Sequence, residues 1–177
     1  KEAVKWYQKA AEQGNANGQA SLGQMYRDGQ GVEQDYAKAL EWYRKSAEQG
    51  NADGQGNLGA MYAKGQGVEQ DYAKALEWFR KSAEQGNANG QASLGFMYFE
   101  GKGVEQDPKE ALQWYRKAAC GGFAAAQFHL GWMYANGEGV RKNSREARKW
   151  YRKAADQGFA ETQFTPGLMY AKGEGIR

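Results

Sequence analysis

The sequence predicts an all-α solenoid built from 36-residue helix-turn-helix repeats. Three observations predict this fold class. Tryptophan recurs every 36 residues, an aromatic residue directly follows each tryptophan, and a glycine lies eight residues after it. Self-similarity at a fixed period of roughly 20 to 50 residues is typical of repeats that stack and bury their apolar faces against one another. The recurring tryptophans are Trp6, Trp42, Trp78, Trp114 and Trp150.

The period divides the whole chain, and we expect residues 1–177 to form a single solenoid. Because the sequence begins and ends within a repeat, we expect it to be a segment of a longer array. The full repeats span 15–50, 51–86, 87–122 and 123–158, with a half repeat at 1–14 that holds a second helix and another at 159–177 that holds a first helix.

The first helix of each repeat is predicted by an apolar face, as in Leu58, Met61 and Tyr62, which lie at positions i, i+3 and i+4. Gly59 stands within this pattern, although glycine in a helix interior costs about 1 kcal/mol relative to alanine. Its recurrence in every repeat predicts a helix crossing that leaves no room for a Cβ atom. The equivalent glycines are Gly23, Gly59, Gly95, Gly131 and Gly167.

The second helix follows a Gly-x-Gly-Val link and a residue that favours the N-cap position. In the first full repeat its apolar face comprises Ala39, Leu40, Tyr43 and Ala47, and Gly50 follows its end. Neither helix can bury its apolar face alone, whereas stacked pairs can. The predicted N-caps are Asp35, Asp71, Asp107 and Asn143.

The chain resembles the Sel-1-like repeat family, a relative of the tetratricopeptide repeats. The resemblance implies a right-handed α-α superhelix that acts as an adaptor, with the first helices lining the concave surface and another protein or peptide as the partner. The pattern runs through the whole chain. In the third repeat it reads Leu94, Gly95, Tyr98, Gly101, Gly103, Val104, Asp107, Ala111, Trp114, Tyr115, Ala118, Ala119 and Gly122.

The resemblance also bears on location and on alternative functions. Many bacterial members are exported and act at the envelope or on host proteins, so we expect a periplasmic or secreted protein, although this segment carries no targeting sequence. The alternative function is an exported bacterial regulator of an envelope enzyme or a binder of a host protein, and an enzyme acting on cell-wall or β-lactam substrates is a third. Some secreted members have paired cysteines in each repeat, which this chain lacks because Cys120 is its only cysteine.

Function is expected where repeats differ, because the shared positions hold the stack. The variable positions of the first helices form a ridge that changes from small and polar to aromatic along the chain. One interpretation is a binding surface, since aromatic residues dominate binding hot spots. The other is that the rings pack against neighbouring helices, above all Phe128. The candidate partner-binding residues are Gln24, Arg27, Phe96, Phe99, Phe128, Trp132 and Leu168.

A second departure is charge. Residues 141–177 contain 9 basic and 4 acidic residues, whereas residues 1–140 contain 15 basic and 17 acidic ones. This basic segment is interpreted either as a site for an acidic protein, a phosphate-rich polymer or anionic lipid, or as a solvated face. No base-stacking motif accompanies it, which disfavours nucleic acid. Its residues are Arg141, Lys142, Arg145, Arg148, Lys149 and Arg152.

Catalytic and cofactor chemistry is not predicted. His129 is the only histidine, so catalytic triads are disfavoured, and no cofactor, metal or catalytic residues are expected. We expect His129 to face solvent and Cys120 to lie near the surface. Pro166 replaces a leucine within the last first-helix pattern and predicts a bent or delayed helix there. No apolar stretch long enough to span a membrane occurs, and a monomer is expected.

Overall fold

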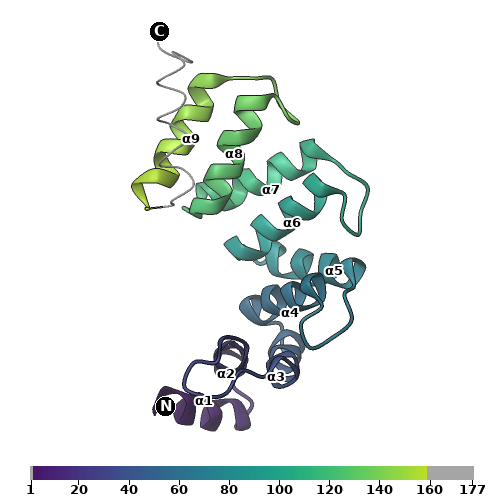
Figure 1. The fold of residues 1–177 in the computed structure, drawn as a ribbon, viewed down its shortest axis with the longest axis vertical. Coiled ribbons are helices and arrows are strands. Elements are labelled where there is room, and N and C mark those ends of the chain that lie inside the picture. Colours follow the sequence, from purple (N-terminus) through teal and green to yellow (C-terminus); the bar gives the residue numbers. More distant parts are fainter. Residues whose placement is uncertain (1, 159–177) are drawn as a thin grey trace. The chain divides into compact units, whose positions relative to one another are not determined.

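The structure is a computed structural model that describes residues 2–158. The predicted all-α solenoid of helix pairs is confirmed, and nine helices follow one another within this range (Figure 1). The half repeat 159–177, with Phe164, Pro166 and Leu168, lies outside the described residues. The helices are α1 (Glu2–Glu12), α2 (Ala16–Asp28), α3 (Tyr36–Glu48), α4 (Ala52–Lys64), α5 (Tyr72–Glu84), α6 (Ala88–Glu100), α7 (Pro108–Cys120), α8 (Ala124–Asn136) and α9 (Ser144–Asp156).

We call α2, α4, α6 and α8 the A helices, and α1, α3, α5, α7 and α9 the B helices. The predicted N-caps of the B helices are confirmed: the Asp35 carboxylate accepts the Lys38 backbone N–H at 3.0 Å, and Asn143 caps α9 in the same way. The bond from the Lys38 backbone lowers the pKa of Asp35 below its ordinary value. The A helix α2 ends at its C-terminus with Gly29, which takes the left-handed conformation (φ 68°).

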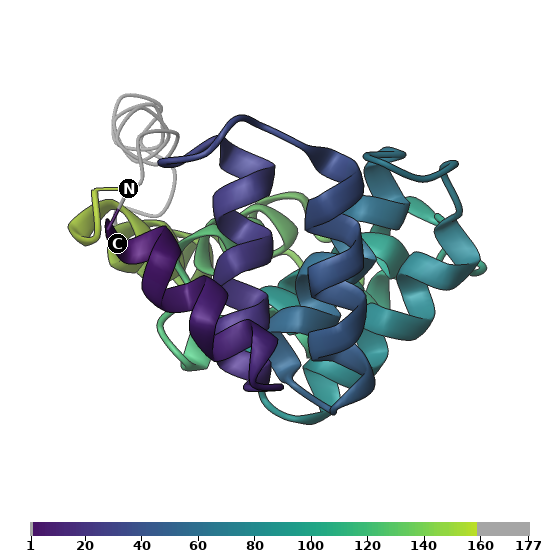
Figure 2. The same ribbon diagram turned by 90° about the horizontal axis from the view of Figure 1, so that it is seen from below.

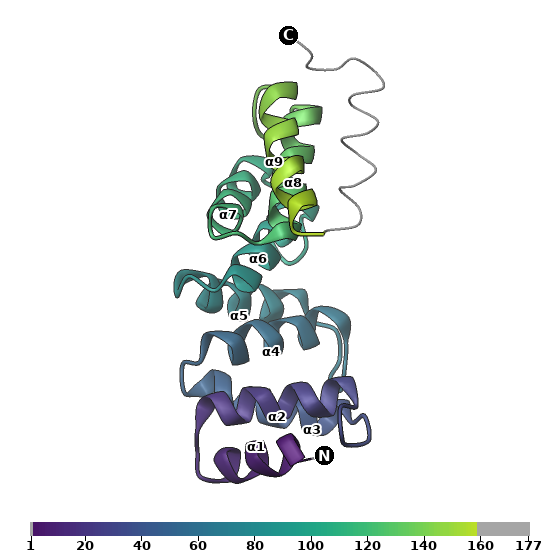
Figure 3. The same ribbon diagram turned by 90° about the vertical axis from the view of Figure 1, so that its left-hand side faces the viewer.

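The chain forms two compact units, which are described separately. Within the described residues, the first unit comprises 2–90 and 102–104, and the second comprises 91–101 and 105–158. In the first unit, α2 packs beside α3 (Figure 2), and α1 packs against α2 (Figure 3). In the second unit, α8 packs beside α9 (Figure 1). None of the helices within residues 2–158 has the length and apolar character that crossing a membrane requires.

The prediction that the mid-helix glycines allow close crossings is confirmed. A Cβ atom placed on Gly23 would lie 2.8 Å from the ring of Tyr43, and one on Gly59 would lie 2.8 Å from Phe79. In the second unit, Gly131 meets Tyr151 in the same way. The A helix of a repeat therefore packs its backbone directly on the aromatic residue that follows the periodic tryptophan. This contact explains why both the mid-helix glycine and that aromatic residue recur every 36 residues.

Glutamine side chains join the two helices of a repeat, one of them buried on the A helix and the other exposed just after the B helix. The Gln49 Nε2 donates to Gln19 Oε1 at 2.7 Å, and the same bond recurs between Gln85 and Gln55 at 2.7 Å. The Ser46 hydroxyl adds a bond of 2.7 Å to the Ala16 carbonyl. These bonds satisfy polar groups that would otherwise be costly to bury, so they also select one register between the A and B helices.

The prediction that His129 faces solvent is wrong. Its ring stacks on Tyr115 with the centroids 4.9 Å apart and the planes 14° apart, and it is half-buried. Burial lowers the pKa of His129 below its ordinary value, which outweighs the opposing effect of Glu100. Other repeats carry serine or asparagine at this position, and the position lies between helices rather than on the outer surface.

Candidate partner-binding surfaces

The A-helix ridge of the first unit contains a rigidly held arginine. Arg27 lies at the C-terminal end of α2, where its Nε and Nη2 donate to the two carboxylate oxygens of Asp28 at 2.7 and 3.0 Å. Its Nη1 donates to Asn57 Oδ1 on α4 at 2.9 Å. The hydrogen bond to Asp28 raises the pKa of Arg27, so the guanidinium is charged and fixed in orientation. Gln24, one turn earlier, is exposed.

A cavity of about 360 Å³ opens beside Arg27, between α2 and α4. Ala60 and Met61 supply its apolar wall, and Asn57 and Lys64 supply polar groups. The cavity exists because Ala60 leaves space at the ridge position where other repeats carry Phe96 or Trp132. The sequence places Gln24 and Arg27 on the ridge but does not predict this cavity.

The ridge of the second unit is aromatic, as the sequence indicated. Phe96 is 39% exposed and Trp132 is 36% exposed, which sets both apart from the buried Leu94 and Leu130 on the same helices. The Phe99 ring meets the Trp132 indole edge-on, with the centroids 5.5 Å apart and the planes at 90°. Phe99 is half-buried against the core of this unit, so the Trp132 indole packs on a ring that is itself held by the core.

The remaining ridge aromatic, Phe128, lies elsewhere. Its ring is half-buried and packs on Tyr151 of α9 with a centroid distance of 5.6 Å. Phe128 therefore extends the core of the second unit and does not join the exposed rings of Phe96 and Trp132, in agreement with the packing interpretation for this residue. Leu168 lies outside the described residues.

The basic segment occupies the link before α9 and the outer face of α9. Arg141, Lys142, Arg145, Lys149 and Arg152 are exposed, whereas Arg148 is half-buried. The single acidic residue among them, Glu146, lies 3.6 Å from the Lys149 ammonium. The face that α9 turns inward is apolar and buries Ala147, Trp150 and Tyr151. The charged side chains thus follow one side of a well-anchored helix.

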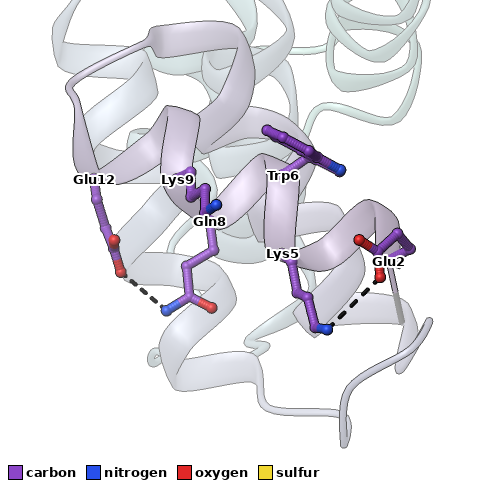
Figure 4. Close-up of a pocket in the computed structure, with 6 residues that line it drawn as sticks. All are labelled: Glu2, Lys5, Trp6, Gln8, Lys9 and Glu12. Atoms are coloured by element: carbon purple, nitrogen blue, oxygen red, sulfur yellow. Dashed lines mark hydrogen bonds and ion pairs between the residues drawn. The ribbon is translucent and has the colours of Figure 1, made fainter.

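Another surface cavity, of about 290 Å³, lies on α1 (Figure 4). Trp6 is 63% exposed there, and the Lys9 ammonium lies 4.9 Å from the centre of its ring. The other lining side chains pair with one another: Lys5 with Glu2 at 3.6 Å and Gln8 with Glu12 at 2.9 Å. The sequence does not distinguish this surface, because Trp6 is one of the periodic tryptophans.

Two buried tyrosine hydroxyl groups without a hydrogen-bond partner were not predicted from the sequence. Among the described residues, the Tyr43 and Tyr115 hydroxyls are buried and have no hydrogen-bond partner. Burial raises the pKa of both side chains well above the ordinary tyrosine value. The signal in the sequence is that phenylalanine replaces tyrosine at the equivalent position 79. Such orphaned groups reduce stability, and they identify positions where the fold does not need a hydroxyl.

Metal-ligating and nucleophilic groups do not converge in the described part of the chain. Among residues 2–158, no three His, Cys, Asp or Glu side chains gather as they would around a metal ion. Cys120 is exposed on the last turn of α7, as expected.

A protein-family model described as the Sel1 repeat matches the chain five times, at residues 1–15, 16–51, 52–87, 88–123 and 124–159. Comparison with curated protein sequences gave no significant match. A Sel1 repeat protein from Oxalobacter formigenes has a similar solved structure: it is 36% identical, its TM-score is 0.90, and the match covers 98% of this chain and 70% of that one.

Two further solved structures carry functional descriptions. A protective antigen of uropathogenic Escherichia coli strains, which displays an SLR fold, is 42% identical with a TM-score of 0.84. The match covers 97% of this chain but only 37% of the antigen, so the chain spans less than half of that protein's length. An immunity protein from Pseudomonas aeruginosa is 28% identical with a TM-score of 0.66, and the match covers 90% of this chain and 59% of that one. From the five repeat matches and the structural likeness, we conclude that the chain belongs to the Sel1 repeat family.

Proposed function

We propose that this protein is a non-catalytic scaffold that binds another protein or a peptide through the exposed faces of its A helices. The observation that carries the proposal is the exposure of Phe96 and Trp132 at the ridge positions of α6 and α8. The fold does not require large rings there, because the first and second full repeats carry Gln24 and Ala60 at the same position.

The surroundings of Trp132 favour a binding role. The edge-on contact with Phe99 holds the indole in one orientation, so little conformational entropy remains to be lost when a partner packs on it. Aromatic side chains that are rigid and partly exposed are the residues that most often dominate protein–protein binding energy. A ring held in this way supplies an anchor before the partner arrives.

The proposal is tested by comparing three forms of the protein as bait for candidate partner extracts. In the test variant, Phe96→Gln and Trp132→Gln are combined, because glutamine is the residue that the first full repeat carries at this position. The control is Trp6→Ala, which removes an exposed tryptophan from α1 instead. Circular dichroism checks that all three forms are equally helical.

We expect quantitative mass spectrometry to identify a protein that the parent chain and Trp6→Ala retain and that the double variant loses at least tenfold. A loss of this size corresponds to about 1.4 kcal/mol, which is less than the roughly 2 kcal/mol or more that truncating one hot-spot residue costs. Equal retention by all three forms would refute a role for the α6 and α8 ridge.

A second candidate surface is the outer face of α9. Residues 141–156 contain seven basic and two acidic residues, a net of +5, whereas the equivalent residues 33–48 contain three basic and four acidic residues, a net of −1. Glu41 forms an ion pair with Lys45 at 2.7 Å, and Lys149 replaces the equivalent acidic residue in α9. The fold therefore accommodates both acidic and basic side chains on this face of a B helix, so folding does not explain the excess positive charge of α9.

We propose that α9 adds electrostatic attraction to an acidic protein partner. One solved relative is an immunity protein, and the alternative function is accordingly an exported protein that regulates or neutralises another protein. Exchanging Lys149→Glu and Arg145→Ala restores the residues of the first full repeat. Association with the partner should then slow and lose its salt dependence. An unchanged association rate at low salt would contradict this role.

A further inference from the structure

The second unit contains an equivalent of the cavity beside Arg27, and there a side chain fills the space. The lining residues Arg27, Asn57 and Ala60 correspond, two repeats of 36 residues later, to Phe99, His129 and Trp132. In the second unit, the Trp132 indole lies against Phe99 with the centroids 5.5 Å apart. In the first unit, Ala60 provides no such ring, and a cavity of about 360 Å³ remains.

The link that follows the A helix is held by the same hydrogen bonds at the two places. Gln34 Nε2 donates to the Arg27 carbonyl at 2.7 Å, and Gln106 Nε2 donates to the Phe99 carbonyl at 2.8 Å. The backbone N–H of Asp35 likewise bonds the Tyr26 carbonyl at 2.9 Å, as that of Asp107 bonds Tyr98 at 2.9 Å. From this shared link we expect a ring placed over Ala60 to meet residue 27 as Trp132 meets Phe99.

Arg27 is prepared to receive a ring. Its Nε, Nη1 and Nη2 each donate one hydrogen bond to Asp28 or Asn57, so the plane of the guanidinium is fixed in orientation before a ring arrives. Arginine stacks on aromatic rings through cation–π attraction as well as through dispersion. Tyr36 adds an aromatic wall, and Met61 adds an apolar one.

The size of the cavity restricts its ligand. Binding sites for whole small molecules have volumes of about 300 to 1,000 Å³, so a space at the lower end of this range suits one large side chain. The internal counterpart identifies that side chain as aromatic, since the protein itself fills the equivalent space with an indole.

We propose that the cavity formed by Arg27, Asn57, Ala60 and Met61 binds an aromatic side chain, foremost tryptophan, from a protein or peptide partner. The ring takes the place that Trp132 occupies in the second unit and stacks on the Arg27 guanidinium. This proposal rests on the proposed function, because a partner polypeptide supplies the ring, and it names the side chain that the first unit recognises.

The test uses nuclear magnetic resonance of the nitrogen-15-labelled chain with capped peptides of the form Gly-Ser-Trp-Ser-Gly. The matched peptide has leucine in place of tryptophan. Ring-current shifts of the Arg27 Nε–H and the Ala60 amide should saturate with the tryptophan peptide, and the leucine peptide should bind at least fivefold more weakly.

Variants locate the binding within the cavity. Ala60→Trp fills it from inside and should weaken peptide binding at least tenfold. Ala3→Trp adds the same ring to the exposed surface of α1 and should leave binding unchanged. Arg27→Gln removes the cation and should weaken binding about fivefold. If Ala60→Trp lowers helicity, Ala60→Phe replaces it, because Phe96 occupies this position naturally in the third full repeat.

Three results would overturn the inference: no shift at millimolar tryptophan peptide, equal binding of the leucine peptide, or undiminished binding by the variant with a filled cavity. None of these results depends on Phe96 or Trp132. The capture experiment on the α6 and α8 ridge therefore stands or fails separately.

Discussion

Replacing Tyr43 with phenylalanine should stabilise the protein. The Tyr43 hydroxyl is fully buried and has no hydrogen-bond partner, and the equivalent residue of the next repeat is Phe79. Leaving a buried hydroxyl unsatisfied costs roughly 1–3 kcal/mol, whereas the ring itself packs on Gly23 in both forms. We therefore expect Tyr43→Phe to raise the free energy of unfolding by about 1 kcal/mol, the lower end of that range, because some relaxation occurs.

The assay is urea denaturation followed by circular dichroism at 222 nm. With a denaturant slope of ~2 kcal/mol per molar urea, the midpoint should rise by roughly 0.5 M. Hydrogen exchange should localise the added protection to α2 and α3, because repeat proteins gain stability repeat by repeat.

The control is Tyr134→Phe, in which the lost hydroxyl does accept a bond from Arg116 Nη2 at 2.7 Å. This variant should be neutral or slightly less stable. The reasoning is refuted if Tyr43→Phe lowers the midpoint, or if both variants raise it equally, since the missing hydrogen bond would then not be the cause.

Three further predictions concern packing and pH. Gly59→Ala should lower the free energy of unfolding by about 1–3 kcal/mol, because its Cβ would lie 2.8 Å from Phe79, whereas Gly56→Ala should not, since other repeats carry alanine there; urea midpoints distinguish the two. Burial holds the pKa of His129 below 6.5, so the contribution of His129 to the free energy of unfolding is present above pH 6.5 and is lost as the pH falls. The variant His129→Asn should therefore show a smaller drop in the urea midpoint between pH 7.5 and 5.5. Burial raises the pKa of Tyr151 to about 12, so the contribution of Tyr151 to the free energy of unfolding is complete below pH 10 and is lost as the pH rises towards 12. The variant Tyr151→Phe should therefore retain more helicity than the parent chain over that interval.

The fold was predictable because its determinants repeat. Gly59 and the aromatic ring that it meets, Phe79 here and tyrosine in the other repeats, recur at a fixed spacing. A glycine that persists within a helix indicates a close contact even before its partner is known. The N-cap role of Asp35 was predictable for a similar reason, since it depends on residues that are neighbours in the chain.

The candidate site was only partly predictable, because it depends on pairs of variable residues from different repeats. The bond between Arg27 and Asn57 joins positions 30 residues apart, and both positions differ from one repeat to the next. A polar residue type suggested an exposed side chain at position 129, whereas the space beside Tyr115 favours a stacked ring. Whether position 60 leaves a cavity is likewise decided by the neighbouring side chains and not by its own residue type.

The paired glutamines have a consequence for how such a chain changes over evolutionary time. The bond between Gln19 and Gln49 and the bond between Gln55 and Gln85 each close within one repeat, and Gly50 and Gly86 mark the ends of those repeats. A copy of residues 51–86 inserted by recombination would therefore arrive with its internal joint complete and with the same connecting ends. Gene duplication can lengthen, shorten or reorder the set of ridge residues in single steps of one repeat, so new combinations of anchors and cavities arise without any new solution to the folding problem.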